Sequence, residues 1–467
     1  MSEQEITLDA PATAASASFT LLLIALSLIV FLINVDYTAV NLALPTMAND
    51  LQASLGTIQW VLTAYVLTWA LLIFPCGSLL AKFTTRQLCL GGLSLFTLAS
   101  LLAGMAFTSH LLIFARMLQG LSAAIYAPAV YGLIHCYVPE DKRGRAMGLL
   151  SLGVGLGLAI GPFVGGTLVA LGSWRAIFLV NLPIGLLAFY VIYKQRDIQQ
   201  QKNTAVPFSK ISALLIGFTT LSLIYLLNQW QVWQQNASLY LVWIVFAIAS
   251  FVGFIYVQKK ILHPLIPLDL FRNRTFSACC LGIFLEQAGF SITIMATSLY
   301  LQNILHYSPL ASGFIFLFLT VIFGIIAMIG GRWVDQKGLT LPTITGMIIM
   351  AVGALLFAVV ASGQQGLLVC PVLFITGIGM GLAFIGLNTG IVKAVTQEQV
   401  GIATSIFMVL ALISNSFGIT LTTLFYQHAQ RIGGLNGISE IMLLSMGISL
   451  IAAISFWQLN RAKSMNQ

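Results

Sequence analysis

Long apolar stretches separated by short polar turns run through the whole chain. A helix crosses the core of a lipid bilayer with about 20 apolar residues. Fourteen stretches fit this length, at residues 20–44, 57–80, 87–107, 110–136, 145–171, 175–194, 210–228, 238–258, 276–302, 309–331, 341–361, 367–392, 401–427 and 439–460. The pattern predicts an all-α membrane protein with fourteen transmembrane helices.

Polar segments near residues 195–209 and 259–274 divide this series into six, two and six helices. We therefore predict a cytosolic tail (1–18), a six-helix bundle (19–195), two inserted helices with flanking cytosolic loops (196–274), a second six-helix bundle (275–460) and a short cytosolic tail (461–467). The first apolar run is too long for a signal-peptide core and is expected to stay as a helix. Two such halves predict a substrate path at their interface.

Composition and charge agree with a membrane location. Hydrophobic residues make up 59% of the 467 residues and charged residues only 7%, against about 25% charged in soluble proteins. With fourteen crossings and an inner N-terminus, eighteen of the 21 basic residues fall on the inside, as cytoplasmic loops require. We expect a multi-pass protein of the plasma or inner membrane with both termini in the cytoplasm. We also expect a monomer whose partner is the lipid bilayer and not nucleic acid.

Cysteine and histidine give no sign of a metal site or of enzyme chemistry. The six cysteines lie in or beside apolar segments without metal-ligand spacing, which suits small packing residues. The five histidines are scattered over helix ends and loops. We expect no disulfide, no metal, no cofactor and no enzymatic activity.

Three charged residues fall inside predicted spans, where charges are costly and usually functional: Asp36, Arg116 and Glu286. From helix rise, Asp36 and Arg116 lie roughly 13 Å and 9 Å from the outer ends of their helices. They are at similar depth in the same half, so they can pair. Glu286 lies roughly 15 Å deep, near the midplane, without a basic residue at its depth in the second half.

A buried carboxyl without a cationic partner binds and releases protons near neutral pH. We therefore hypothesise that Asp36, Glu286 or both carry a coupling proton, with Arg116 beside them, and that a cationic substrate competes for the carboxylate. The alternatives are structural: a packing ion pair between Asp36 and Arg116, and a hydrogen-bonded acid at Glu286.

Further polar and aromatic residues within spans are candidates for substrate binding. Aromatic rings together with acids suit lipophilic cations through cation–π contacts, although packing is the commoner role for each of these side chains taken singly. The candidates are Tyr65, Trp69, Gln119, Tyr126, Gln287, Asn388 and Asn415.

The fifth stretch carries glycines four residues apart, at 153, 157, 161 and 165, followed by Gly166. Glycines at this spacing form a smooth face that lets another helix approach closely. Pro162 removes a backbone hydrogen bond and permits a bend. The combination predicts a helix with a special packing role.

Several motifs together resemble the major facilitator superfamily, and within it the fourteen-helix drug:proton antiporters. Residues 157–166 are similar to the antiporter signature G-x-x-x-G-P-x-x-G-G, and residues 36–45 to D-x-T-[IV]-V-N-x-A-L-P. Residues 116–120 resemble R-x-x-Q-G, residues 174–183 resemble W-R-x-x-F-x-x-N-x-P, and residues 264–273 resemble the stretch before the ninth helix.

The resemblance implies two six-helix bundles and proton-driven export of lipophilic, often cationic, compounds by alternating access. It associates Asp36 and Arg116 with proton and substrate handling, whereas Glu286 was found from burial alone. The superfamily's loop between the second and third helices reads G-x-L-x-D-x-x-G-[RK]-[RK], which residues 77–86 match in part. A second copy of this motif, at residues 331–338, keeps its acid, Asp335, which implies a conformational latch. The first copy has Ala81 and Thr84 in place of its Asp and Gly, which weakens the corresponding latch. Ala411 stands where many relatives have Arg.

Two functions remain open within transport: export of many drugs, and dedicated export of one metabolite or siderophore. The antiporter-like glycine pattern argues against uptake. A membrane enzyme or a sensor would need clustered reactive residues or a soluble domain, neither of which the sequence offers.

Overall fold

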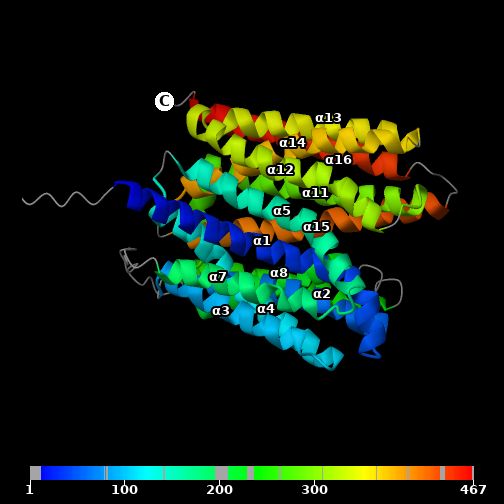
Figure 1. Cartoon of the computed structure of the whole chain (residues 1–467). Helices are drawn as coiled ribbons and strands as arrows, with labels where there is room; N and C mark the ends of the chain where they lie inside the picture. Colours follow the sequence, from blue (N-terminus) through cyan, green and yellow to red (C-terminus); the bar gives the residue numbers. More distant parts are fainter. Residues whose placement is uncertain are drawn as a thin grey trace, which may run out of the picture.

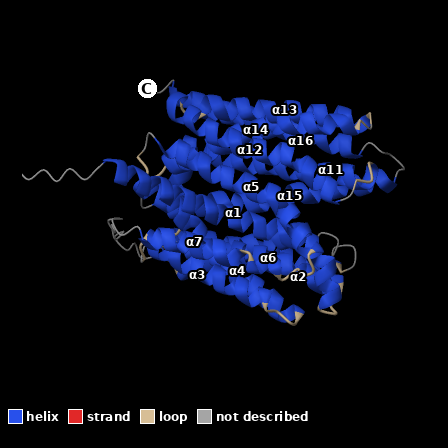
Figure 2. Cartoon of the chain, viewed as in Figure 1, coloured by secondary structure: helices blue, strands red, loops and turns tan. Residues whose placement is uncertain are grey.

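The computed structural model describes residues 12–77, 79, 83–139, 142–194, 209–228, 236–261, 264–307, 309–363, 365–396, 399–431 and 437–464. Within these ranges every regular element is helical (Figure 2). A helix lies at each of the fourteen predicted stretches. Thirteen of the described helices are long and apolar enough to cross a membrane, and a shorter apolar helix covers Trp60–Cys76. Fourteen crossings therefore remain a prediction.

The first half consists of seven helical segments packed side by side. They are α1 (Ala12–Asp50), α2 (Leu55–Gly77), α3 (Thr85–Gly104), α4 (Ser109–Tyr137), α5 (Arg143–Ala170), α6 (Ala176–Leu179) and α7 (Asn181–Lys194). The predicted sixth stretch is thus broken into α6 and α7 at Val180. Thr84 begins α3 with a capping box, in which its hydroxyl accepts from the Gln87 amide at 3.2 Å.

The second half contains the remaining long helices. They are α11 (Arg274–Leu299) continued by a π-turn η4 (Tyr300–Ile304), α12 (Pro309–Lys337), α13 (Thr340–Ser362), α14 (Val369–Lys393), α15 (Val400–Arg431) and α16 (Gly437–Ser464). Short 3₁₀ segments, η3 (Leu268–Arg272) and η5 (Gly366–Leu368), precede α11 and α14. Figure 1 shows α11–α14 and α16 grouped on one side of the bundle and α2–α4 and α7 on the other.

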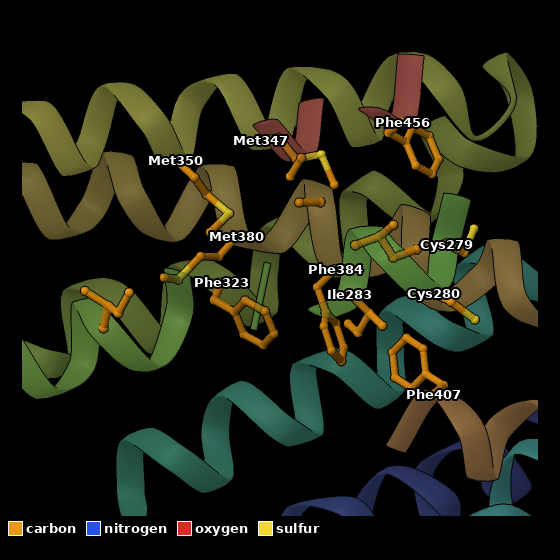
Figure 3. Close-up of a cluster of buried hydrophobic side chains, with 14 of the residues drawn as sticks. Cys279, Cys280, Ile283, Phe323, Met347, Met350, Met380, Phe384, Phe407 and Phe456 are labelled. Carbon is orange, nitrogen blue, oxygen red and sulfur yellow. The ribbon is translucent and has the colours of Figure 1, made fainter. Parts of the chain in front are cut away.

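Apolar side chains fill the centre of the second half. Phe384 lies between Phe323 and Phe407, with ring centroids 5.5 and 6.2 Å apart, and Ile283 of α11 lies in the same cluster (Figure 3). Where lipid surrounds the helices, such rings stabilise the bundle through close van der Waals packing rather than through removal from water. Glu286 follows Ile283 by three residues, and one helical turn therefore separates the acid from this cluster.

The two inserted helices are α8 (Lys210–Asn228) and α10 (Ala237–Lys260). α8 contacts both halves: the Gly217 backbone lies against the Leu71 carbonyl of α2, and the Thr420 hydroxyl of α15 donates to the Leu227 carbonyl at 2.7 Å. α10 packs on α8 and leaves most of its apolar side chains exposed. The exact boundaries predicted for the three units stay predictions.

Helix α5 lies between α1 and α12 (Figure 1). Its glycines form two different contact faces. A Cβ on Gly153, Gly157 or Gly165 would meet carbonyl oxygens of α1 at 2.6–2.7 Å, whereas a Cβ on Gly148 or Gly155 would meet carbonyls of α12 at 2.5–2.6 Å. The predicted glycine stripe therefore packs α5 within its own half, and a second set of glycines brings the two halves together.

The bundle has two ends, which we name by their acidic residues. Asp335 near the end of α12 contacts the start of α5, so this is the Asp335 end. Asp50 closes α1 and contacts Arg175 just after α5, so the opposite end is the Asp50 end. At the Asp50 end Gly172 has φ +110°, and at the Asp335 end Gly338 has φ +79°, a conformation that glycine adopts without a steric penalty.

Candidate functional site

Asp36 and Arg116 form an ion pair in the interior of the first half. The Nη1 atom of Arg116 donates to Oδ2 of Asp36, and neither side chain is exposed. Arg116 lies on α4 and Asp36 on α1, so the pair joins two helices, as their similar predicted depths allow. A charge-assisted contact of this kind is strong where water is excluded, but each partner is costly to bury alone.

Arg116 is held by three further groups. Its Nε donates to the Val61 carbonyl of α2 at 2.9 Å, and its Nη1 also donates to Oε1 of Gln119 at 2.7 Å. The guanidinium carbon lies 4.4 Å from the centre of the Tyr65 ring. The cation–π surface of Tyr65 is therefore already occupied by a protein cation.

Two polar residues complete this network and were not among the predicted site residues. Asn181, the first residue of α7, donates through Nδ2 to Oδ1 of Asp36 at 2.9 Å. Ser100 of α3 accepts from Gln119 Nε2 at 2.8 Å and from Asn181 Nδ2 at 3.4 Å. Gln119 Nε2 also reaches Asp36 Oδ1 at 3.4 Å. We call Asp36, Arg116, Gln119, Ser100 and Asn181 the Asp36 network.

Three predicted substrate-binding residues of the first half lie next to this network. Tyr65 and Trp69 of α2 have ring centroids 5.9 Å apart, and Tyr126 of α4 packs on Phe96 at 6.0 Å. The hydroxyls of both tyrosines and the indole Nε1 are buried without a hydrogen-bond partner among the described residues. These three groups are hydrogen-bond donors that a substrate could use. The side chain of Gln119 is instead fully engaged inside the Asp36 network.

Glu286 lies on α11 in the other half, with a side chain only 1% exposed. Its Oε2 accepts from Nε2 of Gln287 at 2.8 Å, and Asn415 of α15 donates to Gln287 Oε1 at 3.3 Å. Its Oε1 has no partner, and no ion pair between described residues includes it. Two predicted substrate-binding amides thus lie beside an acid with one unsatisfied oxygen.

Asn388, the remaining predicted substrate-binding residue, is buried on α14, and its side chain lies near the Tyr131 hydroxyl of α4. This contact connects the two halves. It places Asn388 at their interface rather than beside Glu286 or Asp36.

Asp335 forms a second polar junction between the halves. Its two oxygens accept from the backbone N–H groups of Gly144 and Arg145, each at 3.0 Å, and Lys393 lies 3.2 Å from Oδ1. These amides open α5, where a helix N-terminus favours a negative charge. Asp335 thus connects the start of α5 to α12 and α14 at this end, and its role as a latch stays a prediction.

The other motif residues are placed as follows. Gly161 lies against Thr38 of α1, and Gly165 against Ala39, while Gly166 has open space around it. α5 continues unbroken past Pro162, whose side chain lies outside the described residues, as does Ala81. Ala411 is partly buried at the edge of the second-half core.

Comparison with known proteins agrees with this architecture. The family model of the Major Facilitator Superfamily matches residues 26–419 and 279–466. The structure of the human organic anion transporter MFSD10 aligns with a TM-score of 0.65 over 94% of this chain and 98% of its own, at 12% identity. That of the proton:xylose symporter XylE aligns with a TM-score of 0.65 over 95% of this chain and 96% of its own, at 14% identity. These two structures have the same fold.

Three curated relatives have sequence similarity over most of the chain. The multidrug transporter protein MdtP of Bacillus subtilis is 31% identical, covering 86% of this chain and 74% of the relative. The methylenomycin A resistance protein of the same species is 30% identical and covers 82% of each chain. The tetracenomycin C resistance and export protein of Streptomyces glaucescens is 28% identical, covering 82% of this chain and 71% of the relative.

Helical spans, a glycine-packed junction between two halves and buried charges define a polytopic membrane transporter. The chain belongs to the major facilitator superfamily, and has its fold.

Proposed function

We propose that the chain is a proton-coupled exporter of lipophilic, cationic drugs or toxic compounds, working by alternating access. The names of the relatives, which concern multidrug and antibiotic resistance, support export of such compounds. The glycine pattern of α5, shared with antiporters by resemblance, supports exchange rather than uptake. Protons moving inward would drive substrate outward.

The observation that carries the proposal is the unsatisfied carboxyl of Glu286. Asp36 accepts from Arg116, Asn181 and Gln119, so both of its oxygens are occupied. Among the described residues Glu286 accepts from Gln287 alone, and its buried Oε1 has no partner there. An isolated carboxylate in a low-dielectric site is stabilised by binding either a proton or a cation. Glu286 is therefore the group at which the two compete.

A cationic substrate entering beside Glu286 would displace its proton, and Gln287 and Asn415 would orient the substrate through their amides. Asp335 and the N-terminus of α5 would hold the Asp335 end closed while the opposite end admits protons. Release of this latch would open the other side. The transition requires no cofactor, because the free energy comes from the proton gradient.

We place the chain in the plasma membrane as a monomer with fourteen crossings and both termini in the cytoplasm. The charge distribution supports this orientation, because basic residues are retained on the cytoplasmic side. The Asp335 end would then face the cytoplasm and the Asp50 end the outside.

The test is transport by the purified protein in proteoliposomes with an imposed pH gradient, scanning cationic and neutral dyes. We expect the wild type to move protons with substrate, and Glu286→Gln to bind neutral substrate but to lose substrate-driven proton flux. Glu440→Gln is a matched control, since Glu440 is exposed in the first turn of α16. Full coupling in Glu286→Gln would exclude Glu286 as the proton carrier, and no proton flux with any compound would exclude antiport.

A second candidate is a dedicated exporter of one metabolite or siderophore. It is favoured by two relatives that are named for single antibiotics, tetracenomycin C and methylenomycin A. The same dye scan separates the two functions: competition among chemically unrelated compounds indicates multidrug export, and saturation by one compound class indicates the dedicated exporter.

A further inference from the structure

Asn181 occupies an unusual position in the first half. It is fully buried, and it begins α7 directly after the break that separates α6 from α7. Its amide reaches α1 through Asp36 and α3 through Ser100. A buried amide at a helix break can respond to small movements of the chain on either side of it.

The segment that carries Asn181 is fastened to α1 at two points. At the inner point Asn181 donates to Asp36. At the outer point Asp50, the last residue of α1, accepts from Trp174 Nε1 at 3.0 Å and from Arg175 Nη1 at 2.6 Å, just before α6. The inner bond depends on Asp36 being ionised, because a carboxylate oxygen accepts from an amide more strongly than a carboxylic acid does.

The Asp36 network also holds one unused donor and one unused acceptor. Arg116 Nη2 and Asn181 Oδ1 are both buried without a partner among the described residues. Each belongs to a side chain whose other atom binds Asp36. Arginine is always protonated in proteins and amide oxygens accept readily, so both atoms can form new hydrogen bonds when the arrangement around Asp36 changes.

We propose that Asn181 is a positioning residue that holds Asp36 ionised in this conformation and ties its protonation to the arrangement of α6 and α7. The inference rests on the proposed proton coupling. It makes Asp36 a second proton-binding carboxyl besides Glu286, one whose protonation depends on the conformation. When α7 moves away, Asp36 loses a donor and accepts a proton. Arg116 keeps its bonds to the Val61 carbonyl and to Gln119.

The other groups around Asp36 leave room for this role. Arg116 and Tyr126 face it from α4, Tyr65 from α2, and Tyr37 lies beside it on α1. α5 has no titratable residue between Ala146 and Ala170, and the titratable residues of α7 (Tyr190, Tyr193 and Lys194) lie in its last turns. Arg116 is the charged member of this set, and in the part of the chain that the structure describes Asn181 alone joins Asp36 to the broken helix.

The test measures the protonation of Asp36 directly in purified protein. The carboxylic C=O band in the infrared spectrum is titrated against pH, and the Asp36 component is the part lost in Asp36→Asn. We expect Asn181→Leu to move the midpoint of this component upward by about one pH unit, because one hydrogen bond to an ionised group is worth roughly a tenfold change in that equilibrium. Ser100→Ala, which leaves Asp36 its direct donors, should move it less.

Asn303→Leu is the matched control, since Asn303 is exposed in η4 and donates to Tyr426, and it should leave the midpoint unchanged. Asn181→Ala takes the place of the leucine variant if that variant does not fold. An unchanged midpoint in both Asn181 variants overturns the inference, even where their transport is impaired at every pH. Wild-type protein without proton flux would instead defeat the proposed function, so the two failures are distinguishable.

Discussion

The two buried carboxyls of this transporter have opposite surroundings. Asp36 in the first half is bound by three side chains, of which Arg116 carries a full charge. Glu286 in the second half has, among the described residues, a single amide donor and an unsatisfied oxygen, and it lies next to an apolar cluster. Both residues are equally buried, so burial alone does not distinguish an acid held by an ion pair from one left open to a proton or a cation. The partners make that distinction.

This difference separates stability from coupling. Removing a partner from a satisfied buried pair leaves a charge without compensation, whereas neutralising an isolated acid leaves nothing unpaired. Substitutions in the Asp36 network should therefore affect folding and transport together. Substitution of Glu286 should affect coupling with little change in folding.

The largest effect is expected from Arg116→Met, which leaves Asp36 buried without its cation. We expect the free energy of unfolding in detergent to fall by about 3–5 kcal/mol, measured as a shift in thermal unfolding. Glu286→Gln should stay within about 1 kcal/mol, because its loss leaves no orphaned charge.

The double variant Asp36→Asn with Arg116→Met sharpens this contrast. It removes both charges, so most of the lost stability should return, since the remaining groups are neutral. If the double variant is as unstable as Arg116→Met alone, the ion pair is not what makes Arg116 important, and the contrast between the two acids fails.

The second prediction concerns how Asp36 is held in place by α5. A Cβ at Gly165 would lie 2.6 Å from the Ala39 carbonyl of α1, while Gly166 has nothing within 4 Å. Gly165→Ala should push α1 away and lower stability by about 1–3 kcal/mol, with impaired transport. Gly166→Ala is the neighbouring control and should be tolerated. Equal behaviour of the two variants would contradict the packing of α5 on α1.

The helices and the pairing of Asp36 with Arg116 could be predicted, because apolar length and depth along a helix are visible in the sequence. Asn181 and Ser100 could not be predicted as site residues, because uncharged polar residues are common within spans. Whether such a residue bonds to a buried acid depends on which helices meet. The only signal for Asn181 was its place in the motif of residues 174–183. The contact between Tyr131 and Asn388 likewise depends on the packing of the two halves.

The glycines of α5 show the same limit. Their spacing predicts a close helix approach, but the periodicity does not name the partner. The stripe at 153, 157, 161 and 165 contacts α1, and Gly144, Gly148 and Gly155 contact α12. The two sets of glycines lie on different faces of α5. Which neighbouring helix each set contacts therefore depends on where α1 and α12 lie around α5.

The third prediction extends the comparison to Asp335, a satisfied acid at the surface between the halves. Asp335→Asn keeps the shape of the side chain but loses its charge toward Lys393 and the start of α5. The latch should weaken by about 1–2 kcal/mol, so hydrogen exchange at the Gly144 and Arg145 amides should accelerate about tenfold. Asp269→Asn, whose pair with Arg272 is exposed, is the control. Unchanged exchange at both amides would show that Asp335 does not hold this end closed.

The smallest effect is expected at Asp50, an acid outside the spans that is satisfied but 45% exposed. Hydrogen bonds from Arg175 and then Trp174 lower the pKa of its carboxyl. Because the folded-state pKa lies below the unfolded one, the contribution to stability is present above the usual Asp value near 4 and is lost as pH falls through the lowered value. Asp50→Asn should therefore cost about 0.2–1 kcal/mol at pH 7.

Thermal unfolding of wild type and Asp50→Asn at pH 7 and pH 3, with and without added salt, checks this. The difference between the two proteins should shrink at pH 3 and in high salt, since a half-exposed pair is screened. If the stability difference between the two proteins is the same at pH 3 as at pH 7, Asp50 does not stabilise the protein through its charge. The outer fastening of α1 would then depend on packing around Trp174, and only the inner fastening at Asp36 would respond to protons.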